Sequence, residues 1–390
     1  MTPGLAALAA LALFRGPANA VDAATLAEPI RTENLRARVT RLASPEFLGR
    51  QGPGAARAAR YIAEAFEKSG LKPAFGTSYY QPIPSLVLES QSAEPNFLGR
   101  NVVALIPGTD PGLKNEWVLL SAHYDHIGVR NGVLYPGADD NASGVAMLLE
   151  VSNYFAAQKT RPRRTMVFAA FDLEERGLLG AMHFAGHPPL PFHSLKAMLN
   201  ADMLGRSMAN VMDEYLFVLG SEHSPELARL LARVPPEKGL AIGRVSTDLI
   251  GTRSDYGPFR DRKVPYLFFS TGQHPDYHRR TDLPDRIDYE KLRRASTWIA
   301  RLFAHVANDD IAPSWDDRDV KGDLDEIRTV QVLVRRVLAH PELFELSDKQ
   351  RELVSGVEAR LTNIIKSGTV TGEDRTWLLW SARMLLATVF

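Results

Sequence analysis

The sequence predicts an α/β fold in which a mostly parallel central sheet carries helices on both faces, followed by a C-terminal helical extension. Short apolar runs alternate with segments of helical periodicity along most of the chain, as in a parallel sheet covered by helices. After residue 312 the strand-like runs stop, and a polar segment leads into stretches with apolar residues at helical spacing. The 390 residues also exceed the length at which one hydrophobic core usually stops growing, which suits a large domain with an appendage.

The predicted strands are short apolar runs, as expected of strands that are buried on both faces. They lie at residues 101–107, 117–122, 165–171, 195–201 and 264–270. The predicted helices have apolar residues at helical spacing, and the first of them ends at a glycine. They cover residues 54–70, 142–158, 224–234 and 288–308, and the extension adds 324–338, 347–366 and 371–388.

Composition divides the chain into a leader, a main domain and the extension. Residues 1–20 combine the apolar stretch GLAALAALALF with the small-residue sequence ANA, which predicts a signal peptide and export to the periplasm or the medium. This signal peptide is atypical because no lysine or arginine precedes its apolar stretch. The stretch is too short to span a bilayer, so we expect no stable membrane insertion. Residues 21–310 would then form the main domain and residues 311–390 the helical extension.

Charge and cysteine content exclude several classes of function. Lysine plus arginine and aspartate plus glutamate number 46 each, so no overall positive field favours a nucleic-acid partner. The chain contains no cysteine, which rules out disulfides and thiolate metal ligands. A metal site in this chain must therefore use nitrogen and oxygen ligands.

Side chains able to bind metal gather where the predicted strands end. Each cluster alone has an ordinary explanation, as a loop hydrogen-bond pair, a helix N-cap or a surface histidine. Their coincidence at the carboxyl ends of strands, where open α/β sheets bind ligands, favours one common site. The residues concerned are His123, Asp125, Asp139, Asp140, Asp172, Glu174, Glu175, Asp202, His274, His278 and Asp282.

The adjacent Glu174 and Glu175 need a positive charge nearby, because like charges side by side repel each other. Imidazole and carboxylate groups without sulfur suit Zn²⁺ or a similar divalent ion. Two histidines with three or four carboxylates exceed the three protein ligands of one catalytic zinc, and they fit two metals that share a bridging carboxylate. Two dications would also offset the crowded negative charge.

Six motifs carry a family resemblance, in the order SAHYDH, GADDNASG, FDLEERGLLGA, LNADMLG, RSDYGPF and DYHRRTD. With them the sequence resembles the M28 family of co-catalytic zinc exopeptidases, the aminopeptidases of the Streptomyces and Vibrio type. The segment LASPEFLGRQGPGAARAARYIAEAFEKSGLKP is also typical of that family, and the resemblance covers about residues 35–305. It implies the zinc-exopeptidase, phosphorylase/hydrolase-like form of the α/β fold for the main domain.

The resemblance implies a set of metal ligands. His123 and Asp202 would bind one zinc ion, and Glu175 and His278 would bind the second. Asp140 would bridge the two ions, and the family places a cis peptide bond directly after it.

Three further residues receive roles through the resemblance. Asp125 would orient His123 through its other ring nitrogen. Glu174 would be the general base, which takes a proton from the metal-bridging water and passes it to the leaving amine. Tyr277 matches a tyrosine that helps to stabilise the developing oxyanion in some members.

Several neighbours of these residues have roles that the sequence leaves undecided. Asp255 and Asp282 look like residues that orient ligands. Tyr256 stands where many relatives carry histidine. His274 is the main rival to His278 as a ligand, and His278 is preferred because it has an adjoining tyrosine and an aspartate four residues on.

The sequence thus predicts an exported metalloaminopeptidase that hydrolyses N-terminal residues from peptides through a zinc-bridged water and a glutamate base. Its cofactors would be two Zn²⁺ ions, although other divalent ions can occupy such sites, and its partners would be peptide or protein N-termini. The alternative is an aminoacyl cyclotransferase, because glutaminyl cyclases share this scaffold and most of these ligands but work with one zinc. A non-catalytic receptor on the same fold is a third possibility, which the intact ligands and base disfavour.

The walls of the substrate site are predicted only broadly. Residues 250–253 and 206–216 could form them, and Arg253 could face the substrate or make a surface salt bridge. The C-terminal helices could cover the site, mediate dimerisation or simply pack on the core.

Overall fold

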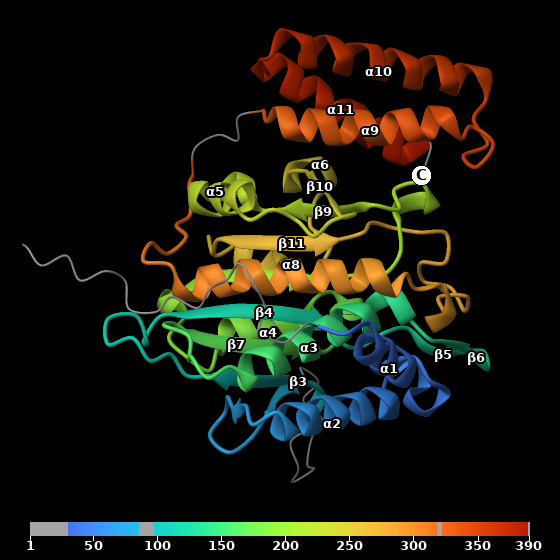
Figure 1. The fold of residues 1–390 in the computed structure, drawn as a ribbon. Helices are drawn as coiled ribbons and strands as arrows, with labels where there is room; N and C mark the ends of the chain where they lie inside the picture. Colours follow the sequence, from blue (N-terminus) through green and yellow to red (C-terminus); the bar gives the residue numbers. More distant parts are fainter. Residues whose placement is uncertain (1–29, 86–96, 318–321, 389–390) are drawn as a thin grey trace, which may run out of the picture.

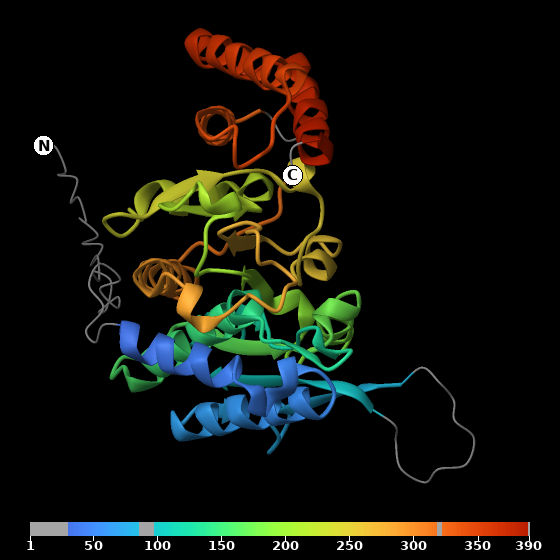
Figure 2. The same ribbon diagram turned by 90° about the vertical axis from the view of Figure 1, so that its right-hand side faces the viewer.

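The structure, a computed structural model, describes residues 30–85, 97–317 and 322–388. The predicted signal peptide, residues 1–20, lies outside the described residues. Figure 1 and, after a quarter turn, Figure 2 show the strands stacked into a sheet, with the C-terminal helices beyond one of its edges. Among the described helices, none combines the length and the apolar character needed to cross a membrane.

A nine-stranded sheet forms the centre of the described chain, in the order β1-β3-β7-β4-β8-β11-β9-β10, with β2 paired to β3 off this path. Strands β7, β4, β8 and β11 are parallel, whereas β3 and β9 run antiparallel to their neighbours β7 and β11. Strands β5 (Gly128–Arg130) and β6 (Val133–Tyr135) form a separate hairpin. The strands of the sheet are β1 Lys72–Pro73, β2 Tyr80–Pro84, β3 Phe97–Ile106, β4 Trp117–His123, β7 Thr165–Phe171, β8 Leu195–Ala201, β9 Tyr215–Leu219, β10 Ala241–Arg244 and β11 Tyr266–Ser270.

Helices cover both faces of the sheet. In β4, Val118 and Leu120 belong to the core that includes α1, α2, α3 and α8, whereas Trp117 and Leu119 belong to the core that includes α4 and α7. All four side chains are fully buried, as expected of a strand that is covered on both sides. The helices are α1 Thr32–Leu42, α2 Pro53–Lys68, α3 Gly144–Ala157, α4 Leu179–Gly186, α5 Pro225–Arg233, α6 Thr247–Ile250, α7 Gly257–Arg260, α8 Tyr289–Asn308, α9 Leu324–Ala339, α10 Asp348–Ser367 and α11 Gly372–Thr388.

The predicted fold class is confirmed, with parallel strands at the centre of the sheet, helices on both faces and further helices at the C-terminus. The predicted strands coincide with β3, β4, β7, β8 and β11. The prediction does not include β1, β2, β9 or β10. Strand β2 contains two prolines and β10 is a partly exposed strand at the sheet edge, so neither has the continuous apolar run of a buried parallel strand.

The three helices of the C-terminal extension share one hydrophobic core. Helices α9, α10 and α11 bury apolar side chains against one another, among them Val334, Val354 and Leu361. The extension meets the main domain at β10 and α6. There Arg375 of α11 donates a hydrogen bond of 2.8 Å to the Ser246 hydroxyl, and the Ser246 N–H donates one of 2.7 Å to Glu326 of α9. Leu249 of α6 also belongs to this core, and the division of the chain at residue 310 stays a prediction.

Candidate metal centre

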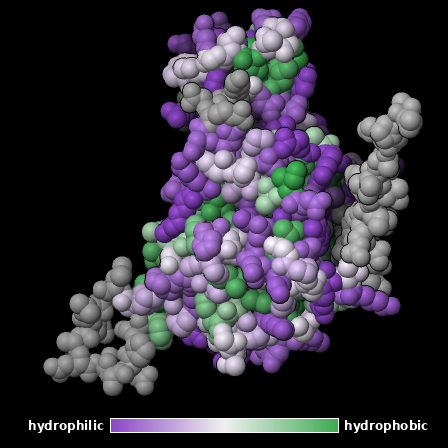
Figure 3. Space-filling view, turned by 90° about the vertical axis from the view of Figure 1, so that its left-hand side faces the viewer, coloured by the Kyte–Doolittle hydropathy of each residue, from purple (hydrophilic) through white to green (hydrophobic). Residues whose placement is uncertain are grey.

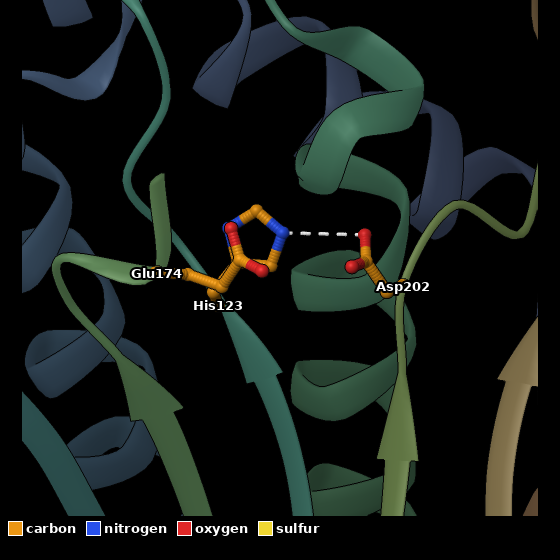
Figure 4. Close-up of side chains that lie close together, drawn as sticks. All are labelled: His123, Glu174 and Asp202. Carbon is orange, nitrogen blue, oxygen red and sulfur yellow. Dashed lines mark hydrogen bonds and ion pairs between the residues drawn. The ribbon is translucent and has the colours of Figure 1, made fainter. Parts of the chain in front are cut away.

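The carboxyl ends of three neighbouring strands bring predicted site residues together. His123 is the last residue of β4, Asp202 directly follows β8, and Glu174 and Glu175 begin the short helix η3 (Glu174–Arg176) after β7. Because β4 lies between β7 and β8 and runs parallel to both, these three strand ends meet at one edge of the sheet. Figure 4 shows His123, Glu174 and Asp202 close together, each at the end of a different strand.

One potential metal-binding group contains His123, Glu174 and Asp202, whose ligand atoms all lie within 4.8 Å of one another. His123 Nε2 is 3.2 Å from Asp202 Oδ1 and 3.4 Å from Asp140 Oδ1. The side chains of His123, Asp140 and Asp202 are buried. The first predicted set of ligands is therefore assembled around one ring nitrogen.

The remaining predicted ligands lie on the other side of Asp140. His278 Nε2 is 3.1 Å from Asp140 Oδ2 and also 3.1 Å from Glu175 Oε2. Asp140 thus directs one carboxylate oxygen to His123 and the other to His278. This arrangement is the one that a bridging carboxylate between two ions requires.

The donor atoms fit two divalent ions. The imidazole and carboxylate atoms that face each other are 3.1–3.4 Å apart. Ligands about 2.0–2.1 Å from a tetrahedral zinc lie roughly 3.3 Å from one another, so these spacings suit an ion held in each group. Asp140 Oδ2 is also buried without a hydrogen-bond partner in the described chain, which suits an oxygen that binds a ligand.

The adjacent glutamates have opposite electrostatic environments. Burial, which nearby His123 only partly offsets, raises the pKa of Glu174 to about 10. Burial also acts on Glu175, but its hydrogen bonds with His126 and His278 outweigh this effect and hold its pKa below the ordinary value. Glu175 is therefore held as a carboxylate, whereas the buried Glu174 takes up a proton readily.

Asp125 fixes the turn that carries both glutamates. Its Oδ1 accepts a hydrogen bond of 3.0 Å from the Glu174 backbone N–H, and its Oδ2 accepts one of 3.3 Å from the Glu175 N–H. The sequence predicts that Asp125 orients His123 through its other ring nitrogen. His123 Nδ1 is 3.3 Å from the backbone oxygen of Asp125 and 3.6 Å from its Oδ1, so both groups of Asp125 lie beside this nitrogen.

Asp282 positions the loop that carries Asp140. Its carboxylate accepts hydrogen bonds from the backbone N–H groups of Asp139 and Asp140, at 3.0–3.1 Å. Burial and the neighbouring Asp139 raise the pKa of Asp282 to about 7. The peptide bond between Asp140 and Asn141 is cis. Asp282 thus holds the backbone at Asp139 and Asp140.

His274 lies apart from both donor groups. Its Nε2 is 3.5 Å from Asp139 Oδ2, and neither atom has a hydrogen-bond partner in the described chain. His274 Nδ1 accepts a hydrogen bond from the Asp276 N–H. Of the two rival histidines, His278 is the one that reaches Asp140 and Glu175.

Tyr256 and Arg253 make hydrogen bonds with the backbone of the turn at residues 250–253. Tyr256 is fully buried, and its hydroxyl accepts a hydrogen bond from the Arg253 N–H and donates one to the Gly251 oxygen. Arg253 is exposed, and its Nε donates to the oxygen of Ile250. Tyr256 therefore shapes the turn at residues 251–253 from inside the protein.

Tyr277 and Asp255 stand beside the donor groups. The ring of Tyr277 stacks on that of His278, with the centroids 3.9 Å apart. Asp255 is fully buried, and neither of its carboxylate oxygens has a hydrogen-bond partner in the described chain. Burial, which nearby His123 partly offsets, raises the pKa of Asp255 to about 8.

His126 is a site residue to which the sequence assigns no role. It is buried, and its Nδ1 is 2.8 Å from Glu175 Oε1 and 3.6 Å from Asp140 Oδ2. His126, Asp140 and Glu175 form the second potential metal-binding group among the described residues. The signal that could have identified His126 is its place three residues after His123, at the end of the same strand.

Comparison with known proteins decides the family. The family model described as "Peptidase family M28" matches residues 101–303, which is more than half of the chain and includes every predicted ligand. The chain belongs to peptidase family M28. This membership confirms the predicted family and identifies an enzyme of the hydrolase class.

Curated relatives of this M28 chain are similar over part of their length. A probable zinc metalloprotease from Leptosphaeria maculans is 30% identical over 254 residues, which cover 61% of this chain and 54% of the relative. An aminopeptidase from Bacillus subtilis is 27% identical over 220 residues, which cover 54% of this chain and 45% of the relative. The chain thus spans about half the length of these relatives.

Solved structures share the fold of this M28 chain at low identity. A zinc aminopeptidase from Bacillus subtilis matches with a TM-score of 0.57 and 16% identity, over 75% of this chain and 99% of that one. A glutaminyl cyclase from Bacteroides thetaiotaomicron matches with a TM-score of 0.55 and 17% identity, over 71% of this chain and 98% of that one. The same fold therefore occurs in a peptidase and in a cyclase.

Proposed function

We propose that this M28 peptidase is an aminopeptidase that removes N-terminal residues from peptides with the help of two divalent metal ions, zinc by preference. The observation that carries this proposal is the position of Asp140, which directs one oxygen to His123 and the other to His278. The similarity to a relative named as an aminopeptidase supports the same activity.

The positions of the donor side chains indicate which residues would bind each ion. His123 and Asp202 would hold one ion, Glu175 and His278 would hold the other, and Asp140 would bind both. When bound, the ions would polarise the scissile carbonyl, lower the pKa of the attacking water and offset the negative charge of the carboxylates.

Glu174 is the proposed general base. Its carboxylate belongs to the His123 group, and in the described chain no hydrogen bond occupies it. Glu174 would take a proton at its carboxylate from the attacking water and deliver it to the amine that leaves. In the metal-free chain burial raises the pKa of Glu174 to about 10, and bound cations would favour the carboxylate form that takes up the proton.

The neighbours of Glu174 and Glu175 would hold them in place for this division of labour. Asp125 fixes both backbone N–H groups of the turn, and His126 binds the Glu175 oxygen that faces away from His278. These contacts leave Glu175 Oε2 directed at an ion. Tyr277, which packs on His278, is the proposed donor to the oxyanion that forms on the substrate.

An aminoacyl cyclotransferase is the second candidate, because a glutaminyl cyclase shares this fold. The placement of Asp140 between two complete sets of donors favours the two-ion peptidase. The substrate class would be peptides or protein N-termini. Export remains part of the proposal and rests on the signal-peptide pattern of residues 1–20.

A hydrolysis profile tests this function. The purified chain is incubated with a panel of aminoacyl-anilides and with a peptide that begins with glutamine, with and without a chelator. We expect release of the anilide, loss of this activity with the chelator, and recovery when zinc is added. Cyclisation of the glutamine peptide without amide hydrolysis would contradict the peptidase function and support the cyclotransferase. Hydrolysis that resists the chelator would contradict the metal-dependent mechanism.

A further inference from the structure

Arg50 is fully buried, and all three nitrogens of its guanidinium donate hydrogen bonds to backbone oxygens of other segments. It ends the short helix η1 (Pro45–Arg50), in the segment LGRQGPG, to which the proposed function assigns no role. The guanidinium donates hydrogen bonds only to backbone oxygens. These bonds run from Nε to Tyr124 (2.8 Å), from Nη1 to Pro136 (2.6 Å) and Leu42 (3.1 Å), and from Nη2 to Gly137 (2.6 Å) and Asp140 (3.0 Å).

Apart from that of Leu42, which ends α1, these backbone oxygens belong to segments that lead from or to metal donors. Tyr124 lies directly after His123, and Asp140 is the residue between the two donor groups. The backbone oxygen of Arg50 also accepts a hydrogen bond from the His126 N–H. Arg50, which is far from both in sequence, therefore joins the end of β4 to the loop of Asp140.

Gly137 packs closely against the Arg50 guanidinium. Gly137 has a φ of +57°, and a Cβ atom there would lie 2.6 Å from Arg50 Nη2 and 2.1 Å from the Asp140 oxygen. Glycine at position 137 therefore allows its carbonyl and that of Asp140 to bind the same nitrogen.

The charge of Arg50 has no direct ion-pair partner in the described chain, because its hydrogen bonds all end on carbonyls. The acidic groups that act on it through space are Asp140, Asp282, Asp125 and Glu175. A buried cation is costly unless opposite charge lies nearby. The acidic metal centre supplies that charge, so the arginine and the centre stabilise each other.

We propose that Arg50 is a positioning residue of the two-ion centre, and that its hydrogen bonds set the distance between His123 at the end of β4 and the Asp140 carboxylate. This inference rests on the proposed function, since it presupposes that the centre binds metal. In the described chain the Arg50 guanidinium makes hydrogen bonds to backbone oxygens and none to the side chains of His123 or Asp140, so it would act on metal affinity through the backbone.

Zinc affinity tests this role directly. The metal-stripped full-length chain and its Arg50→Lys and Arg50→Ala variants are titrated with zinc against a chromophoric chelator, and their melting temperatures are measured by circular dichroism. Lysine retains the charge but cannot reach all five oxygens. We expect both variants to bind zinc about tenfold to a hundredfold more weakly than the wild type, as for other residues that hold ligands in place.

Arg164 provides a matched control, because it is also buried and also donates to backbone oxygens, but at the opposite end of the sheet. Arg164→Lys should lower the melting temperature while zinc affinity stays that of the wild type. Added methylguanidinium should restore zinc binding to Arg50→Ala by filling the space of the lost group. A purely structural role for Arg50 would show neither the selective loss of affinity nor this rescue.

The outcomes separate this inference from the proposed function. If the wild type bound no zinc, the proposed function would fail and the inference with it. If the wild type bound zinc and the Arg50 variants bound it equally well, or Arg50→Lys alone kept full affinity, the positioning role would be wrong while the proposed function stood. If neither Arg50 variant folded, Arg50 would be required by the fold as a whole, which also overturns the inference.

Discussion

The two ends of the parallel strands differ in how completely their polar groups are paired. At the amino ends, Arg164 Nε lies 2.7 Å from Glu116 Oε2, Lys196 lies 3.4 Å from the same carboxylate, and the Trp117 indole donates to the Pro191 oxygen. At the carboxyl ends, carboxylates crowd around histidines. There Asp140 Oδ2, His126 Nε2 and both oxygens of Asp255 are buried without hydrogen-bond partners in the described chain.

Charged side chains at the amino ends are paired with one another, whereas several buried polar groups at the carboxyl ends have no hydrogen-bond partner in the described chain. A buried polar group that is left unpaired costs free energy, so a cluster of them indicates a ligand that completes them. The space-filling view in Figure 3 shows the side of the molecule that lies on the left in Figure 1, away from the carboxyl ends of these strands, and hydrophobic patches there are scattered among hydrophilic residues. The predictions below test whether the two strand ends are independent.

The largest expected effect is on catalysis at the carboxyl ends. Glu174→Gln removes the proposed base and should lower aminoacyl-anilide turnover about a thousandfold, roughly 4 kcal/mol in activation free energy. Bound metal should be unchanged, because the other donors remain. Turnover and metal content are measured together, with the exposed Glu342→Gln as the control. Wild-type turnover in Glu174→Gln would show that the base is wrongly assigned.

A change at the amino ends should affect stability alone. Arg164→Met leaves Glu116 and the oxygens of Val306 and Asp309 without their donor. We expect a loss of about 3 kcal/mol in the free energy of unfolding, because a mostly buried pair is broken. Urea unfolding measures this loss, and zinc affinity and kcat serve as controls. Weaker zinc binding in this variant would show that the two ends are coupled after all.

The pH dependence of the metal-free protein should reveal the crowded end. Burial raises the pKa values of Asp172 and Asp282 to about 7, so these carboxyls hold protons in the folded state that the unfolded chain releases near pH 4. Their contribution to stability is complete below pH 4 and is lost as the pH rises to about 7. His274, whose burial lowers its pKa to about 4, opposes this trend up to its ordinary pKa.

Because the raised carboxyls outnumber His274, we expect the chelator-treated protein to lose on the order of 2 kcal/mol of stability between pH 5 and pH 7. Urea unfolding at both pH values in the presence of a chelator measures this change. Zinc should reduce the slope, since cations offset the carboxylate charge that appears. Stability that rises over this interval in the metal-free protein would be incompatible with the account.

The smallest expected effect lies at the edge of the site. Tyr256→Phe removes the hydroxyl that joins the Gly251 oxygen to the Arg253 N–H. We expect a loss of about 1 kcal/mol in unfolding free energy and unchanged metal content. The KM for aminoacyl-anilides should rise while kcat is preserved, because the turn at residues 251–253 loses its internal support. A drop in kcat without a change in KM would mean that Tyr256 acts on the chemistry.

The centre of the fold could be predicted because buried parallel strands have continuous apolar sequences. The sequence of β7, TMVFAAF, is fully buried along its whole length. Strand β2, with the sequence YQPIP, and β10, with the sequence AIGR, carry no such signal, since pairing at the edge of a sheet tolerates prolines and half-exposed residues. Their place in the sheet is set by long-range pairing.

The candidate ligands could be predicted because their chemistry and their place at strand ends coincide. Asp125 shows the limit of that reasoning, since its carboxylate holds the Glu174 turn and its backbone oxygen meets His123. Arg50 shows the limit more sharply. Its partners are backbone oxygens, which any residue type can offer, and Asp140 lies 90 positions along the chain. No pattern of residue types in the sequence predicts such contacts.

The most direct test of the two-ion centre is a count of bound ions. The metal-stripped chain is reloaded with zinc and examined by native mass spectrometry, beside Asp202→Ala and His278→Ala. We predict two ions in the wild type and one in each variant, because each substitution removes a donor from a different side of Asp140. A wild type that binds a single ion or none, or variants that lose nothing, would contradict the account.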